Sequence, residues 1–137
     1  PQTASILDGQ ERYSSSLMTS YNYQKKAAKV GFSWSDADGA WEKFEEELQE
    51  FQAEAAKGSK ERQLDELGDL LFTLVNIARF YQLSPEEAMV HANRKFQQRF
   101  SHVEKRVSEG SGNFSDYTLA QLDEFWNEAK TLARREE

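Results

Sequence analysis

The sequence contains no cysteine, only two prolines and no long run of apolar residues. Without cysteine, a disulfide framework, a thiolate zinc site and a cysteine nucleophile are all excluded. No apolar stretch approaches the roughly 18–20 residues of a membrane-spanning helix, and no signal-like segment is present. The net charge of −7 argues against binding to a nucleic-acid backbone or to an anionic membrane surface. We therefore expect a soluble cytoplasmic protein with neither a nucleic-acid nor a membrane partner.

The negative charge is concentrated in one part of the chain. Between Asp36 and Asp69 there are 12 acidic and 4 basic residues, whereas the rest of the chain is close to neutral. Blocks of like charge are usually solvated or disordered. Here the acids are interleaved with apolar residues such as Trp41, Phe44 and Leu48. We therefore expect this segment to pack against the rest of the protein.

The spacing of apolar residues predicts an all-α protein, because it follows the helical period and no strand pattern competes with it. We predict helices at about 16–30, 35–57, 60–81 and 84–109, and a fifth that begins near 118. Ser84 with Glu87, and Thr118 with Gln121, have the spacing of capping boxes. Residues 1–14 lack periodicity, so we interpret them as a linker or arm before one helical domain at 15–137.

The third expected helix is apolar over most of its circumference, which is typical of a central helix or of a subunit interface. It also carries a single polar stripe, formed by Arg62, Glu66, Asp69, Thr73 and Asn76. Burying ionised Glu66 and Asp69 costs several kcal/mol unless something neutralises them. Thr73 and Asn76 are interpreted either as supporting those acids or as crossing a dimer interface.

The second expected helix offers carboxylates that can meet the stripe. If the two helices are antiparallel neighbours, as their short connection indicates, Glu47 and Glu50 face Glu66 and Asp69. Four close carboxylates repel one another and raise one another's pKa. Mg²⁺, or alternatively Mn²⁺, is the simple remedy because it takes oxygen ligands and shares them with substrate phosphates. A Glu-rich helix can otherwise be no more than a solvated face.

The fourth expected helix adds positive charge through Asn93, Arg94, Lys95 and Arg99, with Lys95 and Arg99 four residues apart on one face. An acidic group that holds metal and a basic group together indicate phosphate chemistry on a small ligand. No glycine-rich phosphate loop is present, so metal ions would have to hold the phosphates. The alternative is that Lys95 and Arg99 pair with glutamates on neighbouring helices.

Four segments in order resemble the MazG nucleoside triphosphate pyrophosphohydrolases. They read AAKVGFSW at 27–34, KFEEELQEF at 43–51, ELGDLLF at 66–72 and ANRKFQQRF at 92–100. The resemblance runs from about Ser5 to Lys130. The start of the chain also resembles the start of the C-terminal half of two-domain members, which fits a chain that begins at Pro1 without Met.

The resemblance implies an all-α fold with a four-helix-bundle core, assembled as an intimate homodimer or a higher oligomer. It implies Mg²⁺-dependent hydrolysis of NTPs and dNTPs to a nucleoside monophosphate and pyrophosphate. The family's E-E-x-x-E and E-x-x-D motifs fall on Glu46, Glu47, Glu50, Glu66 and Asp69. The last four of these would hold metal, and Glu46 or Glu47 would act as the general base. Substrate binding would fall to Asn93, Lys95, Arg99 and Trp126, with Trp126 stacking on a base unless it packs in a core.

Two other functions remain open at this stage. The chain can be a non-catalytic dimerisation or regulatory half of a two-domain protein, although a retired site need not keep all five motif acids. It can also be a related all-α enzyme, either dUTPase-like or a phosphoribosyl-ATP pyrophosphatase. Phe32 and Trp34, in a short connection between helices, are interpreted either as a base pocket or as hydrophobic anchors.

Overall fold

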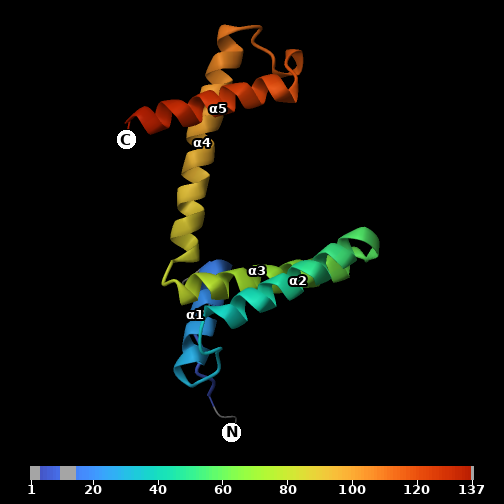
Figure 1. Ribbon diagram of the computed structural model, residues 1–137, viewed down its shortest axis with the longest axis vertical. Helices are drawn as coiled ribbons and strands as arrows, with labels where there is room; N and C mark the ends of the chain where they lie inside the picture. The colour runs from blue at the N-terminus through green and yellow to red at the C-terminus, as the bar shows by residue number, and fades with distance from the viewer. Residues whose placement is uncertain (1–3, 10–14, 137) are drawn as a thin grey trace. The chain divides into compact units, whose positions relative to one another are not determined.

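The computed structural model describes residues 4–9 and 15–136, and these form helices and turns with no strand. The helices are α1 (Ser16–Lys29), α2 (Ala37–Lys57), α3 (Lys60–Phe80), α4 (Pro85–Glu109) and α5 (Leu119–Glu136), with a short 3₁₀ turn at Phe114–Asp116 (Figure 1). The all-α prediction is confirmed. Every predicted helix start, and the ends predicted for the first four helices, lie within about two residues of the observed bounds, which is the precision with which helix ends are defined.

Local side-chain chemistry sets several of these helix ends. The Ser84 hydroxyl accepts a hydrogen bond from the Glu87 backbone N–H at 3.2 Å, which caps α4. At the start of α5, Thr118 accepts from the Gln121 N–H while the Gln121 side chain accepts from the Thr118 N–H, the reciprocal pattern of a capping box. After α1, Gly31 adopts φ +90°, a conformation that glycine takes without steric cost.

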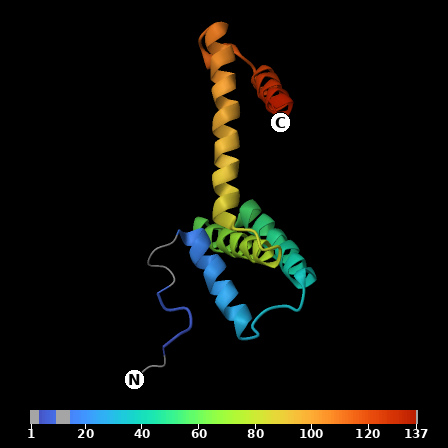
Figure 2. The same ribbon diagram turned by 90° about the vertical axis from the view of Figure 1, so that its left-hand side faces the viewer.

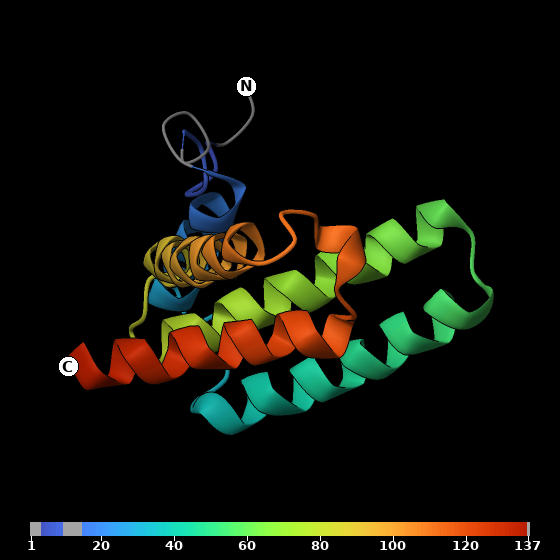
Figure 3. The ribbon, with the colours of Figure 1, turned by 90° about the horizontal axis from the view of Figure 1, so that it is seen from above.

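The chain divides by its internal contacts into two compact units, residues 1–88 and 89–137. In the first unit, α2 and α3 form an antiparallel hairpin joined by Gly58 and Ser59, and they lie side by side in both Figure 1 and Figure 3. Helix α1 packs against α3 (Figure 2), where the Gln24 amide donates a hydrogen bond to the Phe72 carbonyl at 3.1 Å. Helix α3 is therefore the central helix of this unit, as its composition predicts.

Helix α3 buries polar residues and exposes part of its apolar surface. Thr73 and Asn76 of its polar stripe are buried. On the opposite side of the helix, a row of four leucines is exposed in the single chain. They are Leu64, Leu67, Leu71 and Leu74, with exposed fractions of 73%, 38%, 46% and 48%. Nothing within the described part of the first unit covers this row, which we call the leucine face.

The second unit contains most of α4, the 3₁₀ turn and α5. Val103, Val107 and Ala129 form its buried apolar core. The rings of Tyr117 and Phe125 meet edge to face with their centroids 5.7 Å apart. Aromatic contacts therefore supplement a small aliphatic core in this unit.

None of the helices in the described residues is long and apolar enough to cross a membrane. Of the predicted linker at 1–14, residues 1–3 and 10–14 lie outside the described part, and residues 4–9 contain a turn from Ser5 to Asp8. The division into a linker and one domain at 15–137 stays a prediction.

Candidate active site

The connection between α2 and α3 sets the register of the hairpin. The Gln63 side-chain amide donates to the carbonyls of Glu54 at 3.1 Å and Gly58 at 3.3 Å. The Ser59 hydroxyl caps α3 by accepting from the Arg62 N–H at 3.2 Å. These bonds satisfy backbone groups that helix ends otherwise leave unpaired. They also fix how the acids of α2 meet those of α3.

Three predicted metal ligands come together across this hairpin. One carboxylate oxygen from each of Glu47, Glu66 and Asp69 lies within 4.8 Å of the other two. Glu47 is only 5% exposed, Glu66 is half-buried, and Asp69 is exposed. Oε2 of Glu47 and Oε2 of Glu66 are buried and have no hydrogen-bond partner among the described residues. Buried polar atoms are rarely left unpaired. These two unpaired oxygens could therefore serve as ligands to a cation.

Lys43 supplies the positive charge that the sequence analysis did not assign. Its Nζ lies 3.0 Å from Oε1 of Glu47 and 3.6 Å from Oε1 of Glu46. The hydrogen bond to Glu47 raises the pKa of Lys43, so the ammonium stays charged. The spacing of three and four residues along α2 is the signal that could have predicted these pairs. One ammonium leaves most of the acidic charge uncompensated.

Glu50 lies at the edge of the same group. Repulsion from Glu47, followed by burial and by a hydrogen bond with Glu47, raises the pKa of Glu50. A hydrogen bond with Glu66 acts in the opposite direction and places these two carboxyl groups next to each other. The structure thus brings together the four carboxylates that the sequence predicts to be neighbours.

The two acids of α3 also have raised pKa values. Burial, and then repulsion from Glu50 and Glu47, raises the pKa of Glu66. Burial, and then repulsion from Asp65 and Glu47, raises the pKa of Asp69. Both shifts mean that burial and mutual repulsion disfavour the ionised form of these carboxylates. A hard divalent cation fits this all-oxygen set of donors.

Glu46 of α2, and the stripe residues Thr73 and Asn76 of α3, lie outside the acidic group. Glu46 is exposed on α2 and outside the group of three, with Lys43 as its partner. Thr73 donates its hydroxyl proton to the Leu70 carbonyl at 2.8 Å, and Asn76 accepts from Arg79. Neither of these two stripe residues hydrogen-bonds to the acids.

The predicted substrate-binding residues lie in the second unit, described here by itself. Asn93 and Lys95 are exposed, and Arg99 and Trp126 are half-buried. The Arg99 guanidinium lies 5.9 Å from the centre of the Trp126 ring, whose centroid is 5.3 Å from that of Phe96. Among the described residues, neither Lys95 nor Arg99 forms an ion pair with an acid. Trp126 therefore contacts an aromatic ring and a cation within its own unit.

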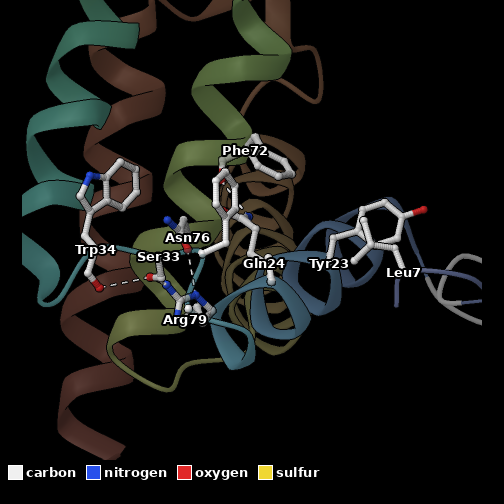
Figure 4. A pocket seen from close by; sticks show the side chains of 11 residues that line it. Leu7, Tyr23, Gln24, Ser33, Trp34, Phe72, Asn76 and Arg79 are labelled. Carbon is white, nitrogen blue, oxygen red and sulfur yellow. Dashed lines mark hydrogen bonds between the residues drawn. The ribbon is translucent and has the colours of Figure 1, made fainter. Parts of the chain in front are cut away.

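A cavity of about 620 Å³ lies between α1, the connection after it and α3 (Figure 4). Phe32 and Trp34 both line it, together with Phe72 of α3. Asn76 and Arg79 add polar groups to its wall. No role for Arg79 follows from the sequence alone, because its position depends on how α1 and the connection dock.

Comparison with known proteins supports the resemblance found in the sequence. Residues 40–104 match the family model of the MazG nucleotide pyrophosphohydrolase domain. The matched range contains the four clustered carboxylates and also Lys95 and Arg99, but it ends before Trp126.

Three relatives bear on the family. The "Nucleoside triphosphate pyrophosphohydrolase/pyrophosphatase MazG" of Thermotoga maritima is 41% identical over 107 residues, which are 78% of this chain and 41% of that protein. The "Nucleoside triphosphate pyrophosphohydrolase" of Escherichia coli K12 is 34% identical over 128 residues, 92% of this chain and 49% of that protein. The "Uncharacterized protein YabN" of Bacillus subtilis is 49% identical over 70 residues, 51% of this chain and 14% of that protein. The chain thus spans less than half the length of these relatives. Residues 40–104 of this chain are thus similar to the MazG nucleotide pyrophosphohydrolase domain.

Proposed function

We propose that this chain hydrolyses nucleoside triphosphates, in the ribo or deoxy form, to the nucleoside monophosphate and pyrophosphate, and that the reaction requires Mg²⁺. The observation that carries the proposal is the meeting of Glu47, Glu66 and Asp69 across the hairpin, with two buried oxygens left unpartnered. The printed names of the Thermotoga and Escherichia relatives give the same reaction class.

In this proposal Glu47, Glu50, Glu66 and Asp69 hold the divalent cation. When bound, such a cation neutralises phosphate charge and lowers the pKa of a coordinated water. Without a cation, the carboxylates would repel the negatively charged triphosphate. The cation is therefore needed for substrate binding as well as for relieving the repulsion among the carboxylates. Mn²⁺ has similar ligand preferences and is expected to substitute.

The general base of the reaction is Glu46 or Glu47. Both carboxylates lie next to Lys43, whose ammonium group can hold a carboxylate in position to accept a proton from water. Because Glu46 lies outside the group of three, it is free to act as a base without serving as a ligand. Glu47 is the alternative because its Oε2 has no partner among the described residues.

Lys95 and Arg99, with Asn93, supply positive charge and hydrogen-bond donors for the anionic triphosphate. Their cationic groups have no acidic partner in the described part of the chain, so pairing with phosphate breaks no ion pair. Trp126 offers a ring for stacking on a base, and its contact with Phe96 holds that ring in place.

The leucine face supports a homodimer as the active assembly. Four leucines in one row on a central helix are an apolar patch of the kind that marks an interaction surface. A second α2–α3 hairpin packed on this face completes a four-helix bundle, because each copy then contributes two helices. We propose the cytoplasm, which supplies both nucleotides and Mg²⁺, as its location.

A nucleotide panel tests this function. Each NTP and dNTP is incubated with the protein, with and without Mg²⁺, and pyrophosphate is measured. We expect turnover only with the metal, and we expect its loss in Asp69→Asn. Glu45→Gln is the control, because Glu45 is exposed on the neighbouring helix α2 and makes no ion pair in the described residues.

The panel also separates the alternatives. No turnover of any nucleotide by the folded, metal-loaded protein contradicts the proposal and favours a dimerisation or regulatory module. Turnover of a single nucleotide favours a specialised dUTPase-like or phosphoribosyl-ATP enzyme. To identify the general base, metal affinity and activity are measured on the same variants. A Glu46→Gln protein that still binds the metal but loses activity identifies Glu46 as the general base.

A further inference from the structure

The cavity between α1 and α3 is an aromatic pocket with a small set of polar groups on one wall. Phe32, Trp34 and Phe72 line it, and all three are partly exposed in the single chain. Its volume of about 620 Å³ lies within the range of cavities that hold small organic ligands. Flat aromatic walls favour a flat aromatic ligand, because stacking works with any π-face.

The polar wall of the pocket consists mainly of hydrogen-bond donors. The Arg79 guanidinium donates through Nε to the Asn76 side-chain oxygen at 2.9 Å and through Nη2 to the Ser33 hydroxyl at 2.6 Å. A guanidinium has five N–H donors, so Arg79 keeps unused donors. Asn76 is buried, and in the described residues its side-chain N–H₂ makes no hydrogen bond. Figure 4 shows both side chains at the same wall.

One acceptor lies on α1. The Gln24 amide nitrogen donates to the carbonyls of Ser20 and Phe72, so its N–H₂ is committed to backbone. Its side-chain oxygen accepts no hydrogen bond from the described residues and remains available to a ligand. Asn76 and Arg79 therefore offer donors to the pocket, and Gln24 offers an acceptor.

Arg79 has no carboxylate partner among the described residues. Burial lowers the pKa of its guanidinium, although an arginine of this kind stays charged at neutral pH. Its positive charge, aimed into an apolar cavity, favours a ligand with electron-rich acceptor atoms. The ring of Phe80, 4.3 Å from the guanidinium carbon, supports the same side chain from its other side.

The pocket continues the face of α3 that carries the acidic group. Asn76 and Asp69 share the polar stripe and are two helical turns apart, roughly 11 Å along the axis. A nucleotide that lies along this face can place its phosphates at the acids and its base in the pocket. This arrangement rests on the proposed function, except that it places the base in this pocket and not on the Trp126 ring.

We propose that this pocket binds the nucleotide base and that Asn76 and Arg79 select a 6-oxopurine, such as guanine, over adenine. Guanine presents two neighbouring acceptors, N7 and O6, whereas adenine presents one acceptor and the N6 amino donor. The donors of Asn76 and Arg79 can pair with both N7 and O6 of guanine. With adenine, one of these donors would face the N6 amino group, which is itself a donor. The Gln24 oxygen in turn accepts from the N1–H of a 6-oxopurine.

A set of base analogues tests the selection without altering the protein. The ratio kcat/KM is measured for GTP, ITP, ATP and 7-deaza-GTP at one Mg²⁺ concentration. We expect GTP and ITP to exceed ATP by about tenfold, the scale of one bidentate base contact. The 7-deaza compound lacks N7 and should fall toward ATP. Equal efficiencies for GTP and ATP overturn the proposal.

Variants then assign the effect to the wall. In Arg79→Met the guanine preference should disappear through a rise in KM for GTP, while ATP changes little. In Arg79→Lys, which keeps the charge without the planar fork, part of the preference should return. Lys29→Met is the matched control, because Lys29 is exposed on α1 and makes no contact with the pocket. A preference that survives Arg79→Met overturns the role of Arg79.

A binding experiment separates this proposal from the hydrolytic function. Guanosine and adenosine, which carry no phosphate, are titrated calorimetrically into the wild type and Arg79→Met without metal. Guanosine should bind the wild type more tightly than adenosine does, and the difference should vanish in the variant. If no nucleotide is hydrolysed but this difference is present, the reaction is wrong and the pocket is right. If hydrolysis occurs and neither nucleoside binds, the pocket is wrong.

Discussion

Replacing two residues of the leucine face with lysine should convert a dimer into monomers. Leu64 and Leu71 together expose surface equal to a little more than one complete leucine side chain in each copy. Full burial of a leucine contributes about 1.5–3 kcal/mol, so the pair contributes about 4–7 kcal/mol to a symmetric dimer. A loss of 4 kcal/mol weakens the dissociation constant by about a thousandfold. The double variant Leu64→Lys/Leu71→Lys should therefore be monomeric at micromolar concentration.

The assay is sedimentation velocity over a dilution series, with circular dichroism to check that each variant stays helical. Both leucines are already exposed in the single chain, so their replacement should change its unfolding free energy by no more than about 0.5 kcal/mol. Val30→Lys is the control, because Val30 is equally exposed but lies at the end of α1. A dimer that survives the double substitution, or a wild type that is monomeric throughout, refutes the role of the leucine face. Mg²⁺ binding should persist in the monomer, since all the acids come from one chain.

Three further predictions concern the acidic group and the pocket. Mg²⁺ at one hundred times its dissociation constant should raise the unfolding free energy by about 2.7 kcal/mol and Tm by roughly 10 °C; differential scanning fluorimetry should show no such rise in Asp69→Asn. Because the pKa values of Glu50, Glu66 and Asp69 are raised on folding, the contribution of these three groups to the stability of the metal-free protein should be fully present below their ordinary values of 4.5 and 3.8. That contribution should be lost as the pH rises through the raised values, whereas Mg²⁺ affinity should increase with pH over the same window. A melting series over pH with chelator would contradict this if stability instead rose through that window. Gly39→Ala should displace the Trp34 ring, which lies where the new Cβ would be, and guanosine binding should weaken; unchanged binding and unchanged tryptophan emission would contradict the packing.

The acidic group could be predicted from the sequence because it depends on local geometry. Helical periodicity fixes the face on which Glu66 and Asp69 lie, and a short connection forces the next helix to run back alongside it. With both helices predicted within about two residues, the meeting of Glu47 with these acids follows. The partner Lys43 was available by the same logic, since it precedes Glu47 by one helical turn.

The pocket could not be predicted in the same way. Arg79 reaches Ser33 across an irregular connection whose path is set by Gly31 and by the packing of Trp34 on Gly39. Such contacts between segments distant in sequence depend on docking and not on periodicity. The same limit applies to Trp126, whose ring contacts Phe96 on a different helix.

The acidic group has a consequence for how the chain folds. All its members come from two helices joined only by Gly58 and Ser59, so their contacts are short-range along the sequence. Short-range contacts close early, because little loop entropy opposes them. We therefore expect the hairpin to meet the repulsion among the carboxylates early in folding. A divalent cation bound as proposed would relieve this repulsion, so we expect Mg²⁺ to help the hairpin form as well as to bind the folded protein.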